Sequence, residues 1–179
     1  MVIREADPSA DGDACAAIYG PYVTGSVISF EERAPTGQEM SERIAAAHVW
    51  LIAELDGSPV GYAYASRHQP RAAYRWAADV AVYIDGDHHG AGIGRALYAR
   101  LFELLLEAGY WTLCAGITQP NPASTGLHRA LGFQPVGTYR RIGWKAGAWH
   151  DVTWWQLDLR PGEPGPPAEP VVPRAPLTP

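Results

Sequence analysis

A glycine-rich loop between a strand and a helix is the feature of this sequence that most limits how the chain can fold. Residues 77–84 alternate in polarity as a strand does, and Asp85-Gly-Asp-His-His-Gly-Ala-Gly-Ile-Gly94 follows directly. An apolar helical face then runs from Leu97 to Ala108 and ends at Gly109. Such a unit exposes several backbone N–H groups beside the positive end of the helix, and this arrangement favours phosphate binding.

The spacing of the glycines excludes two common nucleotide-binding loops. Gly90, Gly92 and Gly94 alternate, whereas a dinucleotide loop of the GxGxxG type needs a third glycine where Arg95 stands. The Gly-Lys-Ser/Thr of a Walker loop is absent as well. On spacing alone, a loop that is glycine-rich only because it turns tightly remains the alternative.

Short strands and helices surround this unit. Thr36 and Glu39 have the spacing of a capping box, and Asp56-Gly57 is typical of a hairpin turn. Alternation along residues 77–84 places Asp79 and Tyr83 on one face of their strand, opposite Val80, Val82 and Ile84. We expect strands at 2–6, 50–54, 60–66, 77–84, 111–117, 135–141 and 152–159, and helices at 14–22, 36–47, 97–108 and 125–131.

Composition indicates one globular domain followed by a tail. The chain has 179 residues, 47% of them hydrophobic and 18% charged, which is enough apolar material for a sizeable core. We place the domain at residues 1–159. Half of the 16 prolines lie in residues 160–179, which we expect to be disordered because they bury little apolar surface. A polyproline segment that binds a partner is the alternative.

Charge and cysteine content narrow the possible partners. A net charge of -5 disfavours a nucleic-acid partner, and no run is long enough to span a membrane. Residues 1–7 mix charges with Val and Ile, unlike a signal peptide, so a cytoplasmic location is expected. Cys15 and Cys114 lack metal-ligand spacing, and neither of the adjacent His88 and His89 shares a face with another ligand cluster. We therefore expect no metal.

The sequence resembles the GNAT superfamily of N-acetyltransferases. His89-Gly-Ala-Gly-Ile-Gly94 is similar to its Gln/Arg-x-x-Gly-x-Gly/Ala pyrophosphate loop, with His89 replacing Gln or Arg. Nearly the whole chain resembles the phosphinothricin acetyltransferase-like family, which includes methionine sulfone and sulfoximine acetyltransferases. The matching segments are Ser29-Phe30-Glu31, Gly61-Tyr-Ala-Tyr-Ala65, Arg71-x-x-Tyr74-Arg-Trp76, Val82-Tyr83, Pro120-Asn121, Leu127-His128, Ala130-Leu-Gly-Phe133 and Trp149-His-Asp-Val152.

This resemblance implies a fold and an assembly. The fold is a single α/β domain with a mixed, mostly antiparallel central sheet that splays between its fourth and fifth strands, with helices on both faces. The assembly is a homodimer.

The resemblance also implies an activity. The chain would use acetyl-CoA to acetylate the primary amine of a small amino-acid-like substrate, such as phosphinothricin, methionine sulfone or methionine sulfoximine. Such enzymes are linked with antibiotic and herbicide resistance. Because we expect no cysteine beside a base in the cleft, the transfer would be direct, in a ternary complex. Departures from the family pattern at 115–120 and 145–148 leave the identity of the substrate open.

Three residues are candidates for catalysis. Asp79 corresponds to the family's catalytic glutamate, and burial would raise the pKa of its carboxyl group toward a useful value. Its side chain is shorter by about 1.5 Å, which favours a water relay; pairing with an Arg or Tyr is the alternative. His128 corresponds to a family histidine, with a structural role as the alternative. Tyr83 could protonate the thiolate or orient the amine, or could only pack.

The resemblance assigns the remaining site residues to two groups. The acetyl-CoA contacts are Val82, Tyr83, Ile84, His89, Gly90, Ala91, Gly92, Ile93, Gly94, Arg95 and Asn121. An Asx turn before a helix is the alternative for Asn121. The substrate contacts are Phe30, Arg71, Tyr74 and Arg75. A guanidinium group can hold a carboxylate or phosphinate through two hydrogen bonds, but both arginines could also be solvated surface charges.

Two other functions fit the same residues. A non-catalytic acyl-CoA-binding sensor is compatible with Asp79 in place of Glu and His89 in place of Gln or Arg. An acetyltransferase for another class of amine, such as an aminoglycoside, would be expected to have an acidic groove. Turnover that depends on the amine distinguishes an enzyme from a sensor.

Overall fold

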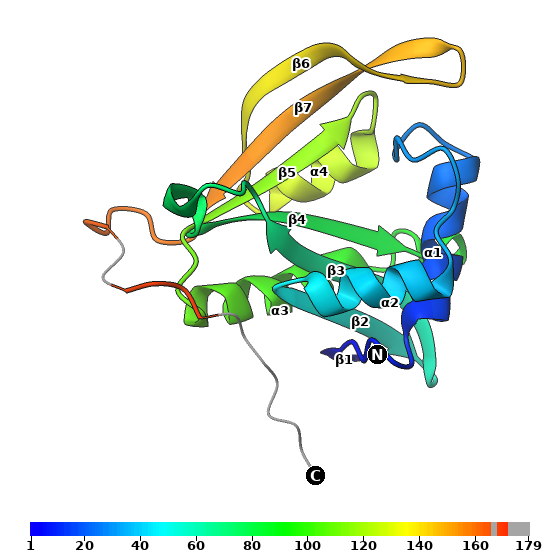
Figure 1. Cartoon of the computed structure of the whole chain (residues 1–179), viewed down its shortest axis with the longest axis horizontal. Helices are drawn as coiled ribbons and strands as arrows, with labels where there is room; N and C mark the ends of the chain where they lie inside the picture. The colour runs from blue at the N-terminus through cyan, green and yellow to red at the C-terminus, as the bar shows by residue number, and fades with distance from the viewer. Residues whose placement is uncertain (166–167, 172–179) are drawn as a thin grey trace.

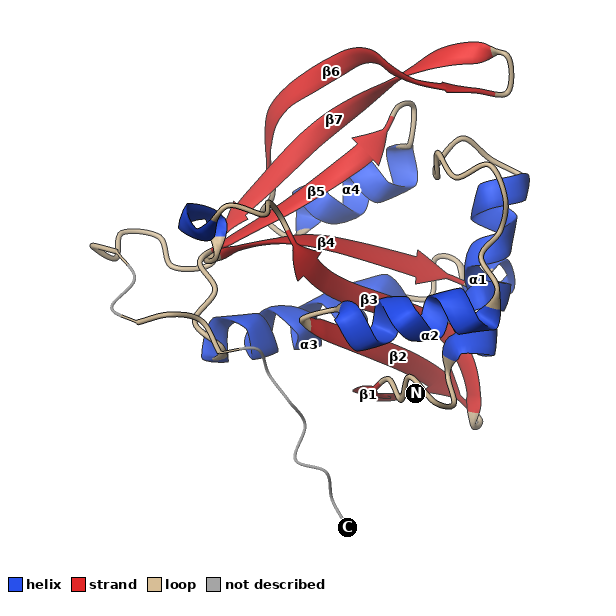
Figure 2. Ribbon diagram, in the orientation of Figure 1, coloured by secondary structure: helices blue, strands red, loops and turns tan. Residues whose placement is uncertain are grey.

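The computed structural model describes residues 1–165 and 168–171 as a seven-stranded sheet with helices on both faces (Figures 1 and 2). The strand order is β1-β2-β3-β4-β5-β7-β6, and every neighbouring pair is antiparallel except β4 and β5, which confirms the predicted fold class. The strands are β1 (Val2–Glu5), β2 (Val49–Leu55), β3 (Ser58–Arg67), β4 (Ala77–Ile84), β5 (Thr112–Thr118), β6 (Gln134–Lys145) and β7 (Ala148–Asp158). The helices are α1 (Gly12–Thr24), α2 (Gly37–Ala46), η1 (Ala72–Tyr74), η2 (Gly86–His88), α3 (Ile93–Glu107) and α4 (Pro122–Ala130).

Successive side chains of β2 point to opposite faces of the sheet and into two different hydrophobic cores. Val49, Leu51 and Ala53 face the core that contains α3, whereas Trp50 and Ile52 face the core formed with α1 and α2. Every one of these side chains is buried. A strand that is apolar on both faces must lie inside the sheet, and β2 does, between β1 and β3.

Local signals in the sequence correctly mark several element ends. The capping box is present: the Glu39 backbone N–H donates to Thr36 Oγ1 at 3.2 Å, and the Thr36 N–H donates to the Glu39 carboxylate at 2.8 Å. Asp56 and Gly57 both have positive φ angles, as the predicted hairpin turn requires. Other boundaries were too short in the prediction: α1 is longer than 14–22, and β6 and β7 are longer than 135–141 and 152–159 because they pair as one long hairpin.

The parallel contact between β4 and β5 is very short. It comprises only the pairs Ala77–Thr112, Ala78–Leu113 and Asp79–Cys114. Beyond Asp79, β4 continues beside β3 and β5 continues beside β7, so the two strands part. The predicted splay between the fourth and fifth strands is therefore confirmed.

The described part of the C-terminal tail returns to the domain (Figure 1). Trp76 Nε1 donates to the carbonyl of Ala168 at 2.9 Å, and the Val171 N–H donates to the carbonyl of Ala108 at 2.9 Å. Arg75 forms an ion pair with Glu169. The predicted disorder of residues 166–167 and 172–179 concerns positions outside the described residues. Among the described helices, none is both long and apolar enough to cross a membrane.

Candidate active site

A cavity of about 570 Å³ occupies the opening between β4 and β5. It runs from the point where the strands part to the first turn of α3, and α4 forms one of its sides. Its lining includes Tyr22, Ile28, Val80, Ala81, Val82, Tyr83, Ile84, His89, Gly90, Gly92, Ile93, Gly94, Arg95, Gly116, Thr118, Asn121, Leu127 and His128. Nearly all predicted acetyl-CoA contacts thus line one cavity; Ala91 lies in the same loop, although it does not line the cavity.

The glycine-rich loop presents the start of α3 to this cavity. Gly90 and Gly92 have φ angles of +78° and +80°, a conformation that glycine adopts without strain. Gly92 is the N-cap of α3, and no side chain caps this helix end. The first N–H groups of α3 therefore have no side-chain acceptor at the cap and can bind an anion.

His89 holds the loop in place. Its Nε2 lies 2.8 Å from the Tyr22 hydroxyl and 3.1 Å from the carbonyl oxygen of Ile84. The same Tyr22 hydroxyl donates to the Ile84 carbonyl at 2.5 Å. His89 thus ties the loop to the end of β4 and to α1. Tyr22, which the sequence analysis did not select, joins all three elements.

Asp79 stands at the closed end of the opening, in the last register pair of β4 and β5. Its Oδ1 lies 2.6 Å from Nδ1 of His68, just beyond the end of β3. Burial raises the pKa of the Asp79 carboxyl group, and the hydrogen bond with His68 works in the opposite direction. His68 was not predicted from the sequence, because eight residues separate it from β4 and hide the pairing.

Comparison with known proteins gives the family. Residues 9–154 match the acetyltransferase (GNAT) domain. The chain is 37% identical to phosphinothricin N-acetyltransferase of Streptomyces viridochromogenes over 162 residues, 88% of each chain. It is 32% identical to L-methionine sulfoximine/L-methionine sulfone acetyltransferase of Salmonella typhimurium, over 89% of this chain and 95% of that one. The chain belongs to the GNAT family of acetyltransferases.

A solved GNAT structure agrees with this assignment. The phosphinothricin acetyltransferase of Sinorhizobium meliloti, in complex with acetyl-CoA, superimposes with a TM-score of 0.89 at 33% identity. The match covers 96% of this chain and 95% of that one. Like its relatives, the protein is an N-acetyltransferase, and GNAT acetyltransferases use acetyl-CoA.

His128 is fully engaged in hydrogen bonds. Its Nδ1 donates to the carbonyl of Ser124 at 2.8 Å, and its Nε2 accepts from the Tyr98 hydroxyl at 3.2 Å. Burial lowers the pKa of the imidazole, so the ring is neutral. With both ring nitrogens engaged, the contacts favour the structural alternative, in which His128 joins α4 to α3.

Tyr83 and Asn121 both line the cavity, and each also makes contacts within the protein. Tyr83 packs among the rings of Tyr19, Tyr22 and Tyr62, and burial raises the pKa of its hydroxyl group well above the ordinary value. The hydroxyl therefore stays protonated and can act only as a donor or acceptor of hydrogen bonds near neutral pH. The Asn121 Oδ1 accepts from the Ser124 N–H at 3.1 Å and caps α4. The Asx-type cap is thus present.

Cys114 lies beside Asp79, although outside the cavity lining. We expected no cysteine beside a base in the cleft; Cys114 pairs with Asp79 in the sheet, and possible ligand atoms of Cys114, Asp79 and His68 lie within 4.8 Å of one another. The His68 and Asp79 atoms are bonded to each other at 2.6 Å, whereas two ligands of a tetrahedral zinc ion lie about 3.3 Å apart. Burial also raises the pKa of the Cys114 thiol to about 11. The cluster is therefore a hydrogen-bonded pair of His68 and Asp79 with a protonated thiol beside it.

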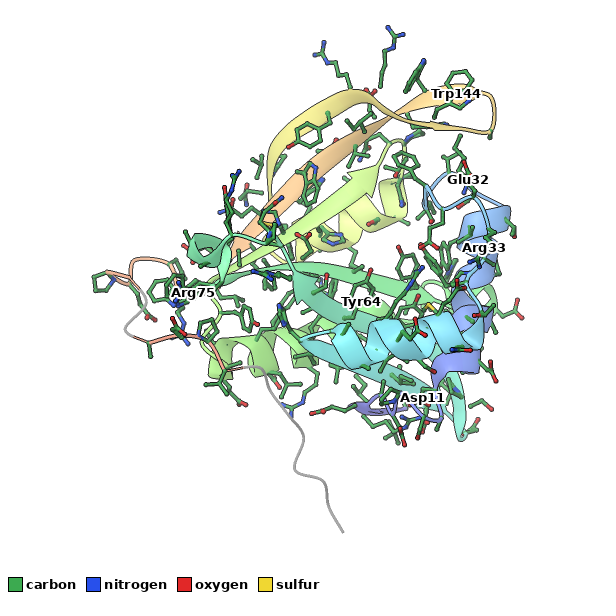
Figure 3. All side chains as sticks on the ribbon, in the orientation of Figure 1. Asp11, Glu32, Arg33, Tyr64, Arg75 and Trp144 are labelled. Atoms are coloured by element: carbon green, nitrogen blue, oxygen red, sulfur yellow. The ribbon has the colours of Figure 1, made fainter. Side chains whose placement is uncertain are left out.

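The predicted substrate residues fall into two separate places. Phe30 lies in the loop after α1, beside Gly143 and His150 of the β6–β7 hairpin. Arg71, Tyr74 and Arg75 lie at η1; Figure 3 shows Arg75 at the opposite end of the molecule from Glu32 and Trp144.

The residues at η1 differ in how they are held. The Tyr74 ring lies 5.9 Å from the ring of His68, beside the His68–Asp79 pair. Arg75 binds Glu169 and lies over the Trp76 ring. Arg71 is exposed and makes no side-chain hydrogen bond to another described residue.

The Cys114 environment predicts a thiol of low reactivity. A pKa of about 11 leaves only a small thiolate fraction at pH 8, and the thiolate is the reactive form. We expect native Cys114 to resist iodoacetamide at pH 8, to react faster as the pH rises toward 11, and to react fully once the chain is unfolded. Peptide mass spectrometry measures each state. Rapid modification at pH 7 would contradict the raised pKa.

Proposed function

We propose that this GNAT protein is an acetyl-CoA-dependent enzyme that acetylates the primary amine of a small amino-acid-like substrate with a second acidic group. The observation that carries the proposal is one cavity between β4 and β5, with the uncapped start of α3 at one end and Asp79 just beyond the other end, in the last register pair before the strands part. A base and an anion site at opposite ends of one opening suit a long, phosphate-bearing acetyl donor.

The residues present fit acetyl-CoA. The loop 90–94 and the first turn of α3 would hold the pyrophosphate through backbone N–H groups, and the exposed Arg95 guanidinium lies on the same cavity wall. Val82, Tyr83 and Ile84 would pair with the pantetheine arm as an added strand, since β5 has left this edge of β4. Asn121 lies across the cavity. When bound, the cosubstrate supplies an activated acetyl group as a thioester.

The transfer we propose is direct, in a ternary complex, and needs no metal. The support is chemical: Cys114 is beside a base but is protonated near neutral pH, so it is a poor nucleophile. Incubation of the enzyme with acetyl-CoA in the absence of an amine should add no acetyl group to the protein, as measured by intact mass.

We assign different roles to the three predicted catalytic residues. Asp79 takes part in deprotonating the amine through a relay, because its carboxylate does not itself line the cavity. Tyr83 donates a hydrogen bond from the cavity wall toward the leaving sulfur. His128 positions α4, because both of its ring nitrogens are already bonded.

The substrate class follows from relatives and from charge. The names of the relatives include phosphinothricin and methionine sulfoximine or sulfone, which carry an amine together with acidic or polar oxygens. Arg71 has an exposed guanidinium group that can bind such an acidic group. The protein would act in the cytoplasm and would protect against an antibiotic or herbicide of this class. An aminoglycoside acetyltransferase remains an outcome of the experiment.

We further propose that the protein is a homodimer. The support is an exposed set of large apolar side chains on the β6–β7 hairpin, each between 50% and 65% exposed: Val136, Tyr139, Ile142, Trp144 and Trp149. A monomer rarely leaves such a set in contact with water. Light scattering should give twice the 19.4 kDa chain mass, and Trp144→Glu should shift the protein toward the monomer. A wild-type monomer would contradict the proposal.

The experiment that tests the function is thiol release from acetyl-CoA with a panel of amines. The panel contains phosphinothricin, methionine sulfone, methionine sulfoximine, common amino acids and one aminoglycoside, each with and without EDTA. We expect turnover with one or more of the acidic amines, unchanged by EDTA, and an acetylated product by mass. Tight CoA binding with no turnover would support the sensor instead, and turnover only with the aminoglycoside would change the substrate class.

A pair of glycine variants tests the phosphate loop. Gly92 and Gly57 have φ angles of +80° and +79°, and a Cβ atom would meet nothing within 4 Å at either position. Alanine should therefore cause the same strain of about 1–2 kcal/mol in both. We expect Gly92→Ala to raise the Kd of CoA about tenfold by calorimetry. Gly57→Ala, remote from the cavity, is the control; equal effects on CoA binding would remove the loop from the site.

Two arginine variants test substrate binding. Arg71→Ala should raise KM for the acidic amine about tenfold or more, because a guanidinium–carboxylate pair is lost, and should leave KM for acetyl-CoA unchanged. Arg75→Ala is the matched control, since Arg75 is already paired with Glu169. Steady-state kinetics measures both. An equal rise in the two KM values of Arg71→Ala would exclude its contact with the amine substrate.

A further inference from the structure

We propose that His68 is the catalytic residue that takes the proton from the substrate amine, and that Asp79 orients it, so that the two form a dyad. The inference rests on the proposed acetyltransferase activity and identifies the relay between Asp79 and the substrate. It starts from a contact that the sequence did not reveal, the 2.6 Å hydrogen bond between His68 Nδ1 and Asp79 Oδ1.

The contact determines which nitrogen of His68 can accept a proton. An ionised carboxylate can only accept a hydrogen bond, so Nδ1 carries the hydrogen and donates it to Asp79. The lone pair is then on Nε2. Among the described residues, Nε2 of His68 has no hydrogen-bond partner, so it is available for the substrate.

Aromatic contacts hold the imidazole in this orientation. The Tyr74 ring meets it edge to face at 5.9 Å, and the Trp154 ring does so at 6.0 Å. The Trp154 ring in turn packs against Gly116, where an added Cβ would lie 3.4 Å from the ring. Gly116 lines the cavity, so the Trp154 ring contacts both His68 and a residue of the cavity wall.

The dyad explains how a short carboxylate can serve this site. Asp79 is in the last register pair before the strands part, and the cavity lining begins with its neighbours Val80 and Ala115. The carboxylate itself does not line the cavity. His68 does not line the cavity either; it lies against Tyr74 of η1, so its Nε2 would meet the amine on the η1 side and replace the water that a lone aspartate would need.

The proton and electron balance of the transfer is simple. The ammonium nitrogen of the substrate gives one proton to Nε2 of His68, and its lone pair then forms the C–N bond to the acetyl carbonyl carbon. The C–S bond breaks, and its electron pair moves to sulfur. The nitrogen loses its second proton; one of the two protons ends on the CoA sulfur, and the other leaves to solvent.

Two ionisable groups that face the dyad, Cys114 and Tyr64, stay protonated over the pH range of an assay. Burial raises the pKa of the Cys114 thiol on β5 to about 11 and that of the Tyr64 hydroxyl on β3 to about 12. The Tyr74 hydroxyl group is on η1. The Arg67 guanidinium, next to His68 in the chain, donates instead to the backbone carbonyls of Gln69 and Pro70.

The test compares His68→Phe, His68→Gln and Asp79→Asn with the wild type. Phenylalanine keeps the contacts with Tyr74 and Trp154, and glutamine keeps a donor for Asp79, but neither can take up the proton. We expect His68→Phe and His68→Gln to lower kcat/KM for the amine by about 10²- to 10⁴-fold at pH 7, with CoA affinity unchanged by calorimetry. Asp79→Asn should lose activity as well.

The pH profile separates catalysis from packing. Raising the pH deprotonates the amine without help, so the loss in both His68 variants should shrink about tenfold per pH unit up to the pKa of the amine. A second readout needs no turnover. Nitrogen-15 spectra of the free enzyme should give the Nδ1–H form of His68 in the wild type, and Asp79→Asn should reduce it.

Three results would overturn the dyad. They are full activity in both His68 variants, a loss that is the same at every pH, or an Nε2–H form of His68 in the wild type. In each case a wild type that turns over the amine leaves the proposed function intact. A wild type that binds CoA but acetylates no amine would instead overturn the proposed function and the dyad with it. Circular dichroism confirms that each variant is folded.

Discussion

The separation of β4 and β5 after one short parallel contact is the constraint on which the rest of the structure depends. Each strand keeps a full antiparallel neighbour, β3 for β4 and β7 for β5, so the sheet stays continuous although its middle opens. The backbone groups along the open edges need partners, because unpaired polar groups are costly inside a protein. An extended chain-like ligand can supply these partners, so the opening is suited to bind one.

Glycines allow the start of α3 to lie close to the opening between β4 and β5. Gly94, in the first turn of α3, has no Cβ, and one placed there would lie 3.3 Å from Leu127 of α4 and 3.7 Å from Val82 of β4. Glycine therefore lets the start of α3 approach both cavity walls. The same loop needs Gly90 and Gly92 for their positive φ angles. The glycine pattern thus has one steric cause and one conformational cause, and both serve the helix end that faces the cavity.

The sequence predicted the local features well, because their causes are local. The capping box of Thr36 and Glu39, the turn at Asp56 and Gly57, and the strand–loop–helix unit each depend on residues a few positions apart. The prediction that the sheet splays between β4 and β5 came from the family resemblance, not from the periodicity of the sequence. The residues that escaped prediction depend on distant contacts: Tyr22 bonds 62 residues away to Ile84, and Lys145 Nζ donates to the carbonyls of Val23 and Ser29 at 2.6 Å.

Two departures from the family sequence pattern have local compensation in the fold, which argues against a degenerate, non-catalytic relative. His89, in place of Gln or Arg, is bound by Tyr22 and Ile84, while the backbone of the loop stays open toward the cavity. Asp79, in place of Glu, is bonded to His68 and is half-buried, a position that costs stability unless it is paired. A sensor would gain nothing from a carboxylate kept there, since a small apolar side chain would fit the strand at lower cost. A retained and paired charge is the arrangement expected for the proposed activity.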